Sequence, residues 1–169
     1  MKTIRFVALV LSVLLCGQVA QAGEPRLVGT FGDWSAYVYT DGDSKVCFMS
    51  SQPSKSEGKY ATRGEIFAMV TNRPKEGTKN VFSFVAGYDY KPEAGASLKI
   101  DSDTVLLFTQ GDTAWAPDAE NDEKISKLIR SGSKMSVEGT SARGTKTIDN
   151  FSLKGSGAAH DLITKECGA

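Results

Sequence analysis

The chain has 169 residues and carries 20 basic and 20 acidic side chains, so its formal net charge at pH 7 is zero. This balance argues against nucleic-acid binding, because contact with phosphates requires a basic surface. It also argues against attachment to an anionic membrane surface, because the sequence contains no basic amphipathic segment.

The first 22 residues have the pattern of a secretory signal peptide. Lys2 and Arg5 form a positively charged start, the apolar run 6–17 follows, and residues 20–22 (Ala-Gln-Ala) match a small-x-small cleavage site. The apolar run is too short to span a bilayer as a helix. We therefore expect export, with the periplasm as destination and the cell surface or secretion as alternatives.

We predict cleavage between Ala22 and Gly23, which leaves one domain of residues 23–169 without a transmembrane segment. A lipoprotein is the alternative, because Cys16 follows a leucine-rich run. Lipid attachment normally requires a small residue before the cysteine, and Leu15 is not small. Cleavage after Ala22 is therefore the preferred interpretation.

Short segments rich in aromatic and β-branched residues predict strands along much of the domain. These segments are residues 34–39, 45–51, 65–71, 81–88, 97–101 and 104–110. Polar clusters that contain Gly or Pro predict the turns between them. These clusters are residues 41–43, 52–59, 72–80 and 91–95. Residues 134–139 alternate between apolar and polar, which predicts a further half-buried strand. The pattern indicates a mainly β domain, either a sandwich or a barrel.

Two segments have helical periodicity instead. In residues 116–132, Ile125, Leu128 and Ile129 share one helix face. Acidic residues gather near the start of this segment and basic residues near its end, as the helix dipole favours. Gly132 is a plausible C-terminal cap.

The second helical segment lies within "GSGAAHDLITKEC" (155–167). Leu162, Ile163 and Cys167 share one face of a short helix. The apolar face that we expect to pack against the rest of the domain therefore also carries the cysteine sulfur. Cys47 is the other cysteine outside the expected signal peptide. Because two cysteines in an oxidising compartment usually pair, we predict a Cys47–Cys167 disulfide, with two separate thiols as the alternative. They are too few for a structural zinc site.

His160 is the single histidine and the first candidate for catalysis. Its neighbour Asp161 cannot orient it, because adjacent residues on a helix point in different directions. No serine lies in a G-x-S-x-G motif, and the glycines before His160 lack the βαβ context of a dinucleotide site. We therefore predict no catalytic residue, no metal and no cofactor. A hydrolase that uses His160 with a distant serine or carboxylate is an alternative.

The two tryptophans are candidates for either core or contact positions. We expect Trp34 in the core, the commoner fate in a small β domain. Trp115 follows the strand region directly and is a possible binding surface. A small-ligand carrier is another alternative, with an apolar slot between the sheets lined by Phe82, Phe84 or Trp115.

The order of several motifs resembles the invasion-associated locus B family, exported proteins of alphaproteobacteria. The resemblance covers residues 29–167 and is most specific at "GTSARGTKTIDNFSLKGSGAA" (139–159). The other motifs are "FGDWSAY", "KVCFMSSQP", "LKID" and "LFTQGDTAWA". Many members carry a cysteine shortly after the "GDW" tryptophan, and residues 35–39 here contain none.

This resemblance implies an immunoglobulin-like β-sandwich in the periplasm or envelope and supplies no catalytic residues. The family name records an association with host-cell invasion in some members. We therefore predict an exported, non-enzymatic protein-interaction module whose unknown partner is an envelope or host-cell protein. The predicted fold is mainly β, with one or two short helices.

Overall fold

The computed structural model describes residues 23–168. The expected signal peptide, which ends at Ala22, lies outside the described residues. The described residues form eleven strands, two α-helices and one 3-10 turn. In chain order these are β1 (Arg26–Phe31), β2 (Trp34–Asp41), β3 (Ser44–Ser51), β4 (Lys55–Gly58), β5 (Phe67–Arg73), η1 (Pro74–Glu76), β6 (Thr78–Val85), β7 (Ala96–Ile100), β8 (Asp103–Gln110), β9 (Thr113–Trp115), α1 (Ala119–Ser131), β10 (Lys134–Thr140), β11 (Lys146–Ser152) and α2 (Ser156–Cys167).

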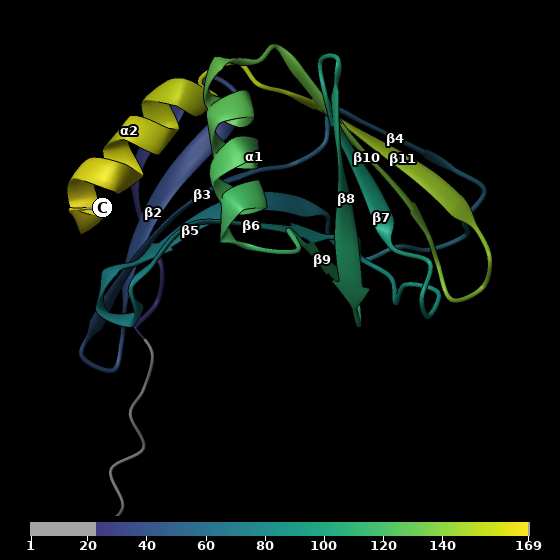
Figure 1. Ribbon diagram of the computed structural model, residues 1–169, viewed down its shortest axis with the longest axis horizontal. Coiled ribbons are helices and arrows are strands. Elements are labelled where there is room, and N and C mark those ends of the chain that lie inside the picture. Colours follow the sequence, from purple (N-terminus) through teal and green to yellow (C-terminus); the bar gives the residue numbers. More distant parts are fainter. Residues whose placement is uncertain (1–22, 169) are drawn as a thin grey trace, which may run out of the picture.

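All strands belong to one antiparallel sheet in the order β1-β2-β3-β5-β6-β9-β8-β7-β10-β11-β4. β8 pairs with β9 on one side and with β7 on the other, and the sheet folds back there so that its halves face each other (Figure 1). Across the core, Trp34 donates its indole N–H to the carbonyl of Ser152 at 3.0 Å. The rings of Phe84 and Phe151 meet edge to face at 6.1 Å. The predicted mainly β sandwich is confirmed, with its two layers continuous through β8.

Strand alternation places the apolar side chains in this core, because successive side chains point to opposite faces. On β2, Trp34, Ala36 and Val38 are buried, while the residues between them are only half-buried. The expected core position of Trp34 is confirmed, since its side chain has no exposed surface. The outer face of the same strands carries aromatic pairs such as Tyr37 and Phe48, whose rings stack at 4.9 Å.

Both predicted helices are present and pack on the half of the sheet that contains β1, β2, β3, β5 and β6 (Figure 1). The side chain of Asp118 caps α1 by accepting the backbone N–H of Asn121 at 2.8 Å. Helix α1 buries Ile125 and Ile129 and packs against β6, while α2 packs against β2 and β3. Within residues 23–168, no helix combines the length and apolar character needed to cross a membrane.

Helix α2 begins where the chain makes a close approach to β1. Gly155 is its N-cap and has φ 91°, a conformation that favours glycine. A Cβ atom at this position would lie 1.8 Å from the carbonyl oxygen of Phe31, so a larger residue would push the helix away. Gly157, expected before the helix, lies inside its first turn.

Four strands were not predicted. The polar segment 52–59, expected to be a turn, contains the edge strand β4, which pairs only with β11. An exposed edge strand does not need apolar alternation, so its sequence resembles a loop. β11 was missed because two of its inward positions hold Thr147 and Asp149 rather than apolar residues. β1 lies before the first aromatic-rich segment, and the three-residue strand β9 follows the predicted segment 104–110.

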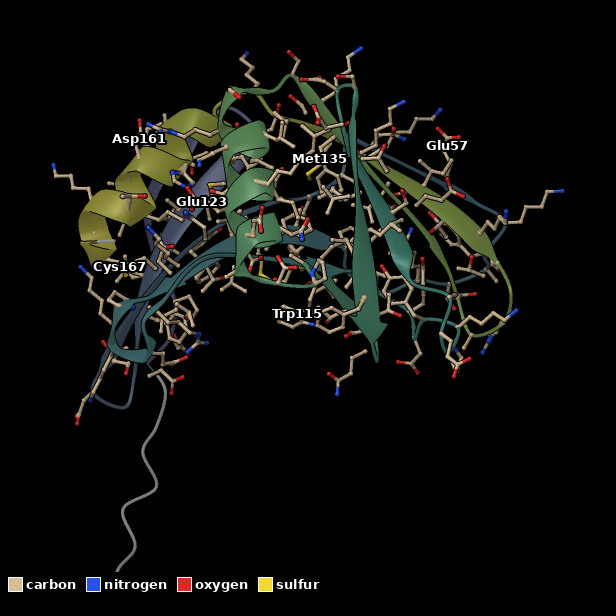
Figure 2. All side chains as sticks on the ribbon, in the orientation of Figure 1. Glu57, Trp115, Glu123, Met135, Asp161 and Cys167 are labelled. Carbon is tan, nitrogen blue, oxygen red and sulfur yellow. A yellow bond between two sulfur atoms is a disulfide. The ribbon has the colours of Figure 1, made fainter. Side chains whose placement is uncertain are left out.

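The Cys47–Cys167 disulfide is present and joins β3 to the last turn of α2 (Figure 2). The two Cα atoms lie 5.9 Å apart, and the sequence separation is 120. Ile163, on the same helix face, is fully buried, as the helical periodicity predicted. The disulfide therefore holds α2 against the first half of the sheet.

Cys167→Ser should lower the free energy of unfolding by about 4 kcal/mol, because the open chain regains the entropy of a long closed loop. Urea unfolding of the oxidised protein and of the variant measures this difference. Reductant should destabilise the wild-type protein to the level of the variant and leave the variant unchanged. Equal urea midpoints for the oxidised wild type and the variant would contradict a stabilising disulfide.

Candidate binding site

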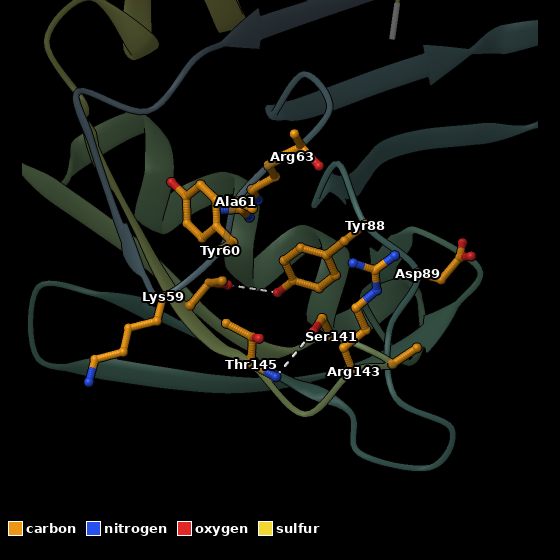
Figure 3. Close-up of a pocket in the computed structure, with 12 residues that line it drawn as sticks. Lys59, Tyr60, Ala61, Arg63, Tyr88, Asp89, Ser141, Arg143 and Thr145 are labelled. Atoms are coloured by element: carbon orange, nitrogen blue, oxygen red, sulfur yellow. Dashed lines mark hydrogen bonds between the residues drawn. The ribbon is translucent and has the colours of Figure 1, made fainter.

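A pocket of about 450 Å³ opens between three segments that connect the strands (Figure 3). The first is residues 59–63, between β4 and β5. The second is residues 88–89, after β6, and the third is residues 141–147, around the turn from β10 to β11. These segments are distant in sequence, so only the folded chain brings their side chains together.

A buried ion pair between Arg63 and Asp149 stands beside this pocket. Their side chains are only 4% and 1% exposed, and the guanidinium donates to both carboxylate oxygens, at 2.8 and 2.6 Å. Arg63 Nε also donates to the carbonyl of Ala86 at 2.6 Å. Burial opposes the charge of the guanidinium, but the carboxylate of Asp149 outweighs this effect and the pKa of Arg63 is raised.

Two tyrosines flank the same guanidinium. Its central carbon lies 4.8 Å from the ring centroid of Tyr88 and 5.4 Å from that of Tyr60, within the range of cation–π contacts. The hydroxyl of Tyr88 shares a hydrogen bond of 2.7 Å with Thr147. Burial raises the pKa of Tyr88, so this phenol is neutral at physiological pH. Arg63 thus orders the aromatic part of the pocket wall.

Backbone hydrogen bonds tie the three segments to one another. Gly64 donates its N–H to the carbonyl of Gly87 at 2.9 Å, and Ala142 donates to the carbonyl of Asp89 at 2.7 Å. Gly87 has φ 69°, and a Cβ atom there would lie 2.5 Å from the carbonyl oxygen of Gly64. The pocket is therefore preformed by main-chain contacts.

A second hollow, of about 550 Å³, lies near the ends of β2 and β3. Serines and other polar residues dominate its lining, including Ser35, Ser50 and Gln52. In its wall, Ser51 donates its hydroxyl to the carbonyl of Asp33 at 2.7 Å. Among residues 23–168, no group of three or more His, Cys, Asp or Glu side chains is arranged to hold a metal ion.

His160 lies away from both hollows, in the contact between α1 and α2. Its Nε2 lies 2.7 Å from Ser126 Oγ and 3.0 Å from Asn80 Oδ1. The amide nitrogen of Asn80 donates to Glu123, so the carbonyl oxygen of Asn80 faces the imidazole and Nε2 must carry the proton. A protonated Nε2 cannot accept the proton of Ser126, as a general base would. The pair is a structural hydrogen bond, and this arrangement does not support the hydrolase alternative.

Trp115 lies on β9, half-buried on the outer face of the sheet (Figure 2). Its direct cross-strand neighbour is Phe108 on β8, which is 48% exposed. Leu106 is two residues away on the same face of β8 and is 74% exposed. We call Leu106, Phe108 and Trp115 the apolar ridge.

The apolar slot expected for a carrier is not formed by the residues predicted to line it. Phe82 and Phe84 are 0% and 1% exposed and pack in the core. Trp115 pairs with Ser83, the residue between them, and so lies on the opposite face of the sheet. These three aromatic residues therefore cannot line one slot.

A family model described as "Invasion associated locus B (IalB) protein" matches residues 34–164. The chain belongs to this family. The resemblance predicted from the sequence motifs is therefore confirmed. No curated protein matches the chain.

Among solved structures, the crystal structure of invasion associated protein B from Bartonella henselae is similar to this chain, with a TM-score of 0.57. The two sequences are 16% identical, and the similarity covers 83% of this chain and 98% of the other. At this level of identity the comparison shows a shared fold.

Arg63, Tyr88 and Asp149 were not singled out from the sequence. One usable signal was present, because Thr147, Asp149 and Phe151 share a strand face. An aspartate on the face that holds a phenylalanine indicates an inward charge, which needs a buried cation as partner. The identity of that cation could not be read from the sequence.

Arg63→Ala should lower the free energy of unfolding by about 3–5 kcal/mol, because it leaves the carboxylate of Asp149 buried without a partner. The matched control is Arg130→Ala, which removes an ion pair of 2.6 Å to Asp161 whose side chains are 53% and 60% exposed. That change should cost about 0–1 kcal/mol. Urea unfolding measures both, and similar losses in the two variants would contradict a special role for the buried pair.

The stability of the protein should fall as the pH drops below about 6.5, the usual pKa of histidine. Burial, together with nearby Arg130, lowers the pKa of His160 in the folded protein. The unfolded chain therefore takes up a proton that the folded chain resists, which favours unfolding. His160→Gln should remove this part of the pH dependence in urea unfolding. An unchanged difference in stability between neutral and mildly acidic pH in the variant would show that His160 is not its source.

Proposed function

We propose that this protein is an exported, non-enzymatic interaction module that acts in the periplasm or elsewhere in the cell envelope. The signal-peptide pattern of residues 1–22 supports export, and so does the disulfide, since such bonds persist in oxidising compartments. The structural bonding of His160 and Ser126 supports a role without catalysis. The related protein from Bartonella henselae is described as invasion associated, so contact with host cells belongs to the same proposal.

The apolar ridge carries this proposal. Leu106 and Phe108 stand largely exposed on β8, and Trp115 adjoins Phe108 across the strand pair. Exposed apolar side chains that gather on one surface typically mark protein contacts, and aromatic residues supply much of the binding energy at such contacts. Because the ridge lies on the outer face of the fold at β8, it is free to approach another molecule.

The shape and chemistry of the ridge indicate the kind of partner. Its side chains are exposed on the outer face of the strand at which the sheet folds back, so they can enter an apolar groove. The two hollows described above are lined mainly by polar residues, so a second copy of this chain does not offer a matching groove there. We infer a partner that offers such a groove, either a different envelope protein or a host surface protein.

A photo-crosslinking side chain at position 106 tests this contact in cells that express the chain with its own N-terminal segment. We expect one discrete adduct with a protein that can be identified by mass spectrometry. The same crosslinker at position 27 is the control, because Leu27 is also exposed but lies on β1, at the far edge of the sheet from β8. Identical adducts from both positions, or none from position 106, would overturn the contact.

Binding to the identified partner then gives the energetic test. Phe108→Ser should weaken the Kd by about thirtyfold, the effect of losing roughly 2 kcal/mol at an aromatic anchor. Leu27→Ser should change the Kd by less than about twofold, because a residue outside the contact contributes little. Cell fractionation in the same experiment tests export, since unprocessed chain confined to the cytoplasm would contradict an envelope role.

A further inference from the structure

The hollow near the ends of β2 and β3 has the size of a small-molecule site. Its volume of about 550 Å³ lies within the usual range for such sites, roughly 300–1,000 Å³. It shares no residue with the apolar ridge, so an inference about it is independent of the proposed protein contact. We call it the serine hollow and define it by the lining residues Asp33, Tyr37, Ser50, Ser51, Ser54 and Phe67.

The register of three strands brings part of this lining together around Ser50. On β2, Ser35 is its direct cross-strand partner, and Tyr37 lies two residues further along the same face. On β5, Met69 is its other direct partner, and Phe67 lies two residues away on the same face. Two aromatic side chains therefore stand on the strands on either side of one small residue, which leaves space between them.

A hydrogen bond brings a carboxylate to the same place. Ser51 donates its hydroxyl to the main-chain carbonyl of Asp33 at 2.7 Å, so the turn before β2 is held against the end of β3. The side chain of Asp33 is exposed, and among residues 23–168 it is the only charged side chain that lines the hollow. It also forms no ion pair within these residues. Its negative charge is therefore free to attract a cation and disfavours an anion.

The buried hydroxyls of the hollow present acceptors rather than donors. Ser51 uses its hydrogen on the carbonyl of Asp33, and Ser54 donates its own to the carbonyl of Asn150 at 3.1 Å. A hydroxyl that has donated its single hydrogen offers only lone pairs. Ser51 is 4% exposed, so only a group that enters the hollow can reach its oxygen. A ligand that fits must therefore bring several hydrogen-bond donors.

The aromatic side chains favour one kind of cation. The ring of Tyr37 stacks on Phe48 at 4.9 Å and is thereby ordered, and Phe67 is half-buried. Aromatic rings pack against apolar stems, and their faces attract cations within about 6 Å. A guanidinium group has five donors and no acceptor, and its plane stacks on aromatic rings. An ammonium group has fewer donors and is more strongly hydrated.

We propose that the serine hollow binds a guanidinium group on an apolar stem, carried either by free arginine or by an arginine side chain of a peptide. The guanidinium pairs with the carboxylate of Asp33 and donates to the hydroxyl oxygens of Ser51 and Ser54. The stem lies against Phe67. A neutral sugar leaves the charge of Asp33 unmatched and brings as many acceptors as donors, so it fits this lining less well.

NMR titration of the oxidised domain with L-arginine and with the blocked tripeptide Gly-Arg-Gly tests the proposal. We expect saturable shifts of the backbone amides in residues 33–37 and 50–54. Binding of the amino acid alone identifies a small-molecule site, binding of the tripeptide alone identifies a peptide site, and binding of both shows that the side chain suffices. No saturable shift in these segments with either ligand would overturn the proposal.

L-Citrulline is the matched control ligand, because it replaces the guanidinium by a neutral urea group of the same shape. It should bind at least about tenfold more weakly than L-arginine, the effect of losing a charge-assisted contact. The same ratio should hold between the arginine tripeptide and its citrulline counterpart. Equal affinities for the charged and neutral ligands would overturn the proposal.

Asp33→Asn separates recognition from folding, because the variant keeps the main-chain carbonyl that Ser51 uses. It should weaken binding of the arginine ligand by at least about tenfold. Glu120→Gln is the matched control, since it neutralises an exposed carboxylate on α1 that does not line the hollow, and it should leave the affinity unchanged. Unchanged affinity in Asp33→Asn would overturn the proposal. Equal losses in the two variants would also overturn it, because the attraction would then come from the overall charge of the domain.

Discussion

One guanidinium connects the two halves of the folded sheet. Arg63 follows β4 of one half in the chain and precedes β5 of the other. Its Nε bonds to the carbonyl of Ala86, just after β6, while its remaining donors hold Asp149 on β11. β8 already joins the halves through continuous pairing, so this buried pair closes the sandwich at a second point. The pocket wall depends on it, because the tyrosines beside the pocket rest on the same group.

The ridge and the pocket are surfaces of opposite chemistry on one small domain. The ridge is apolar and stands on the strand at which the sheet turns, whereas the pocket is polar and built from loops. A rigid sandwich suits both, because neither surface requires a movement of the strands to form. Membership of the invasion associated locus B family defines the fold on which these surfaces lie. The side chains of the ridge and of the pocket, rather than the fold, determine what each surface binds. The two surfaces can therefore be tested separately.

Most of the fold could be predicted from the sequence, because alternation and helical periodicity report directly on burial. The central strands and both helices were expected on these grounds. The disulfide was expected because two cysteines in an exported chain usually pair, and the core position of Trp34 because tryptophan is usually buried in small β domains. The edge strand β4 was missed because exposed strands carry no apolar pattern. The pocket could not be predicted at all, because its residues have no common motif. Lys59, Tyr88 and Arg143 meet only through the topology, and a pattern along the chain contains no information about which loops become neighbours.

The position of the disulfide has a consequence for the order of assembly. The bond encloses everything from β3 to the last turn of α2, so it cannot form until residue 167 has reached the oxidant. By that time every strand of the sheet is available to the folding chain. A chain interrupted earlier lacks Cys167, so its Cys47 has no partner within the chain described here. The covalent closure thus distinguishes finished molecules from fragments, in addition to stabilising the finished ones.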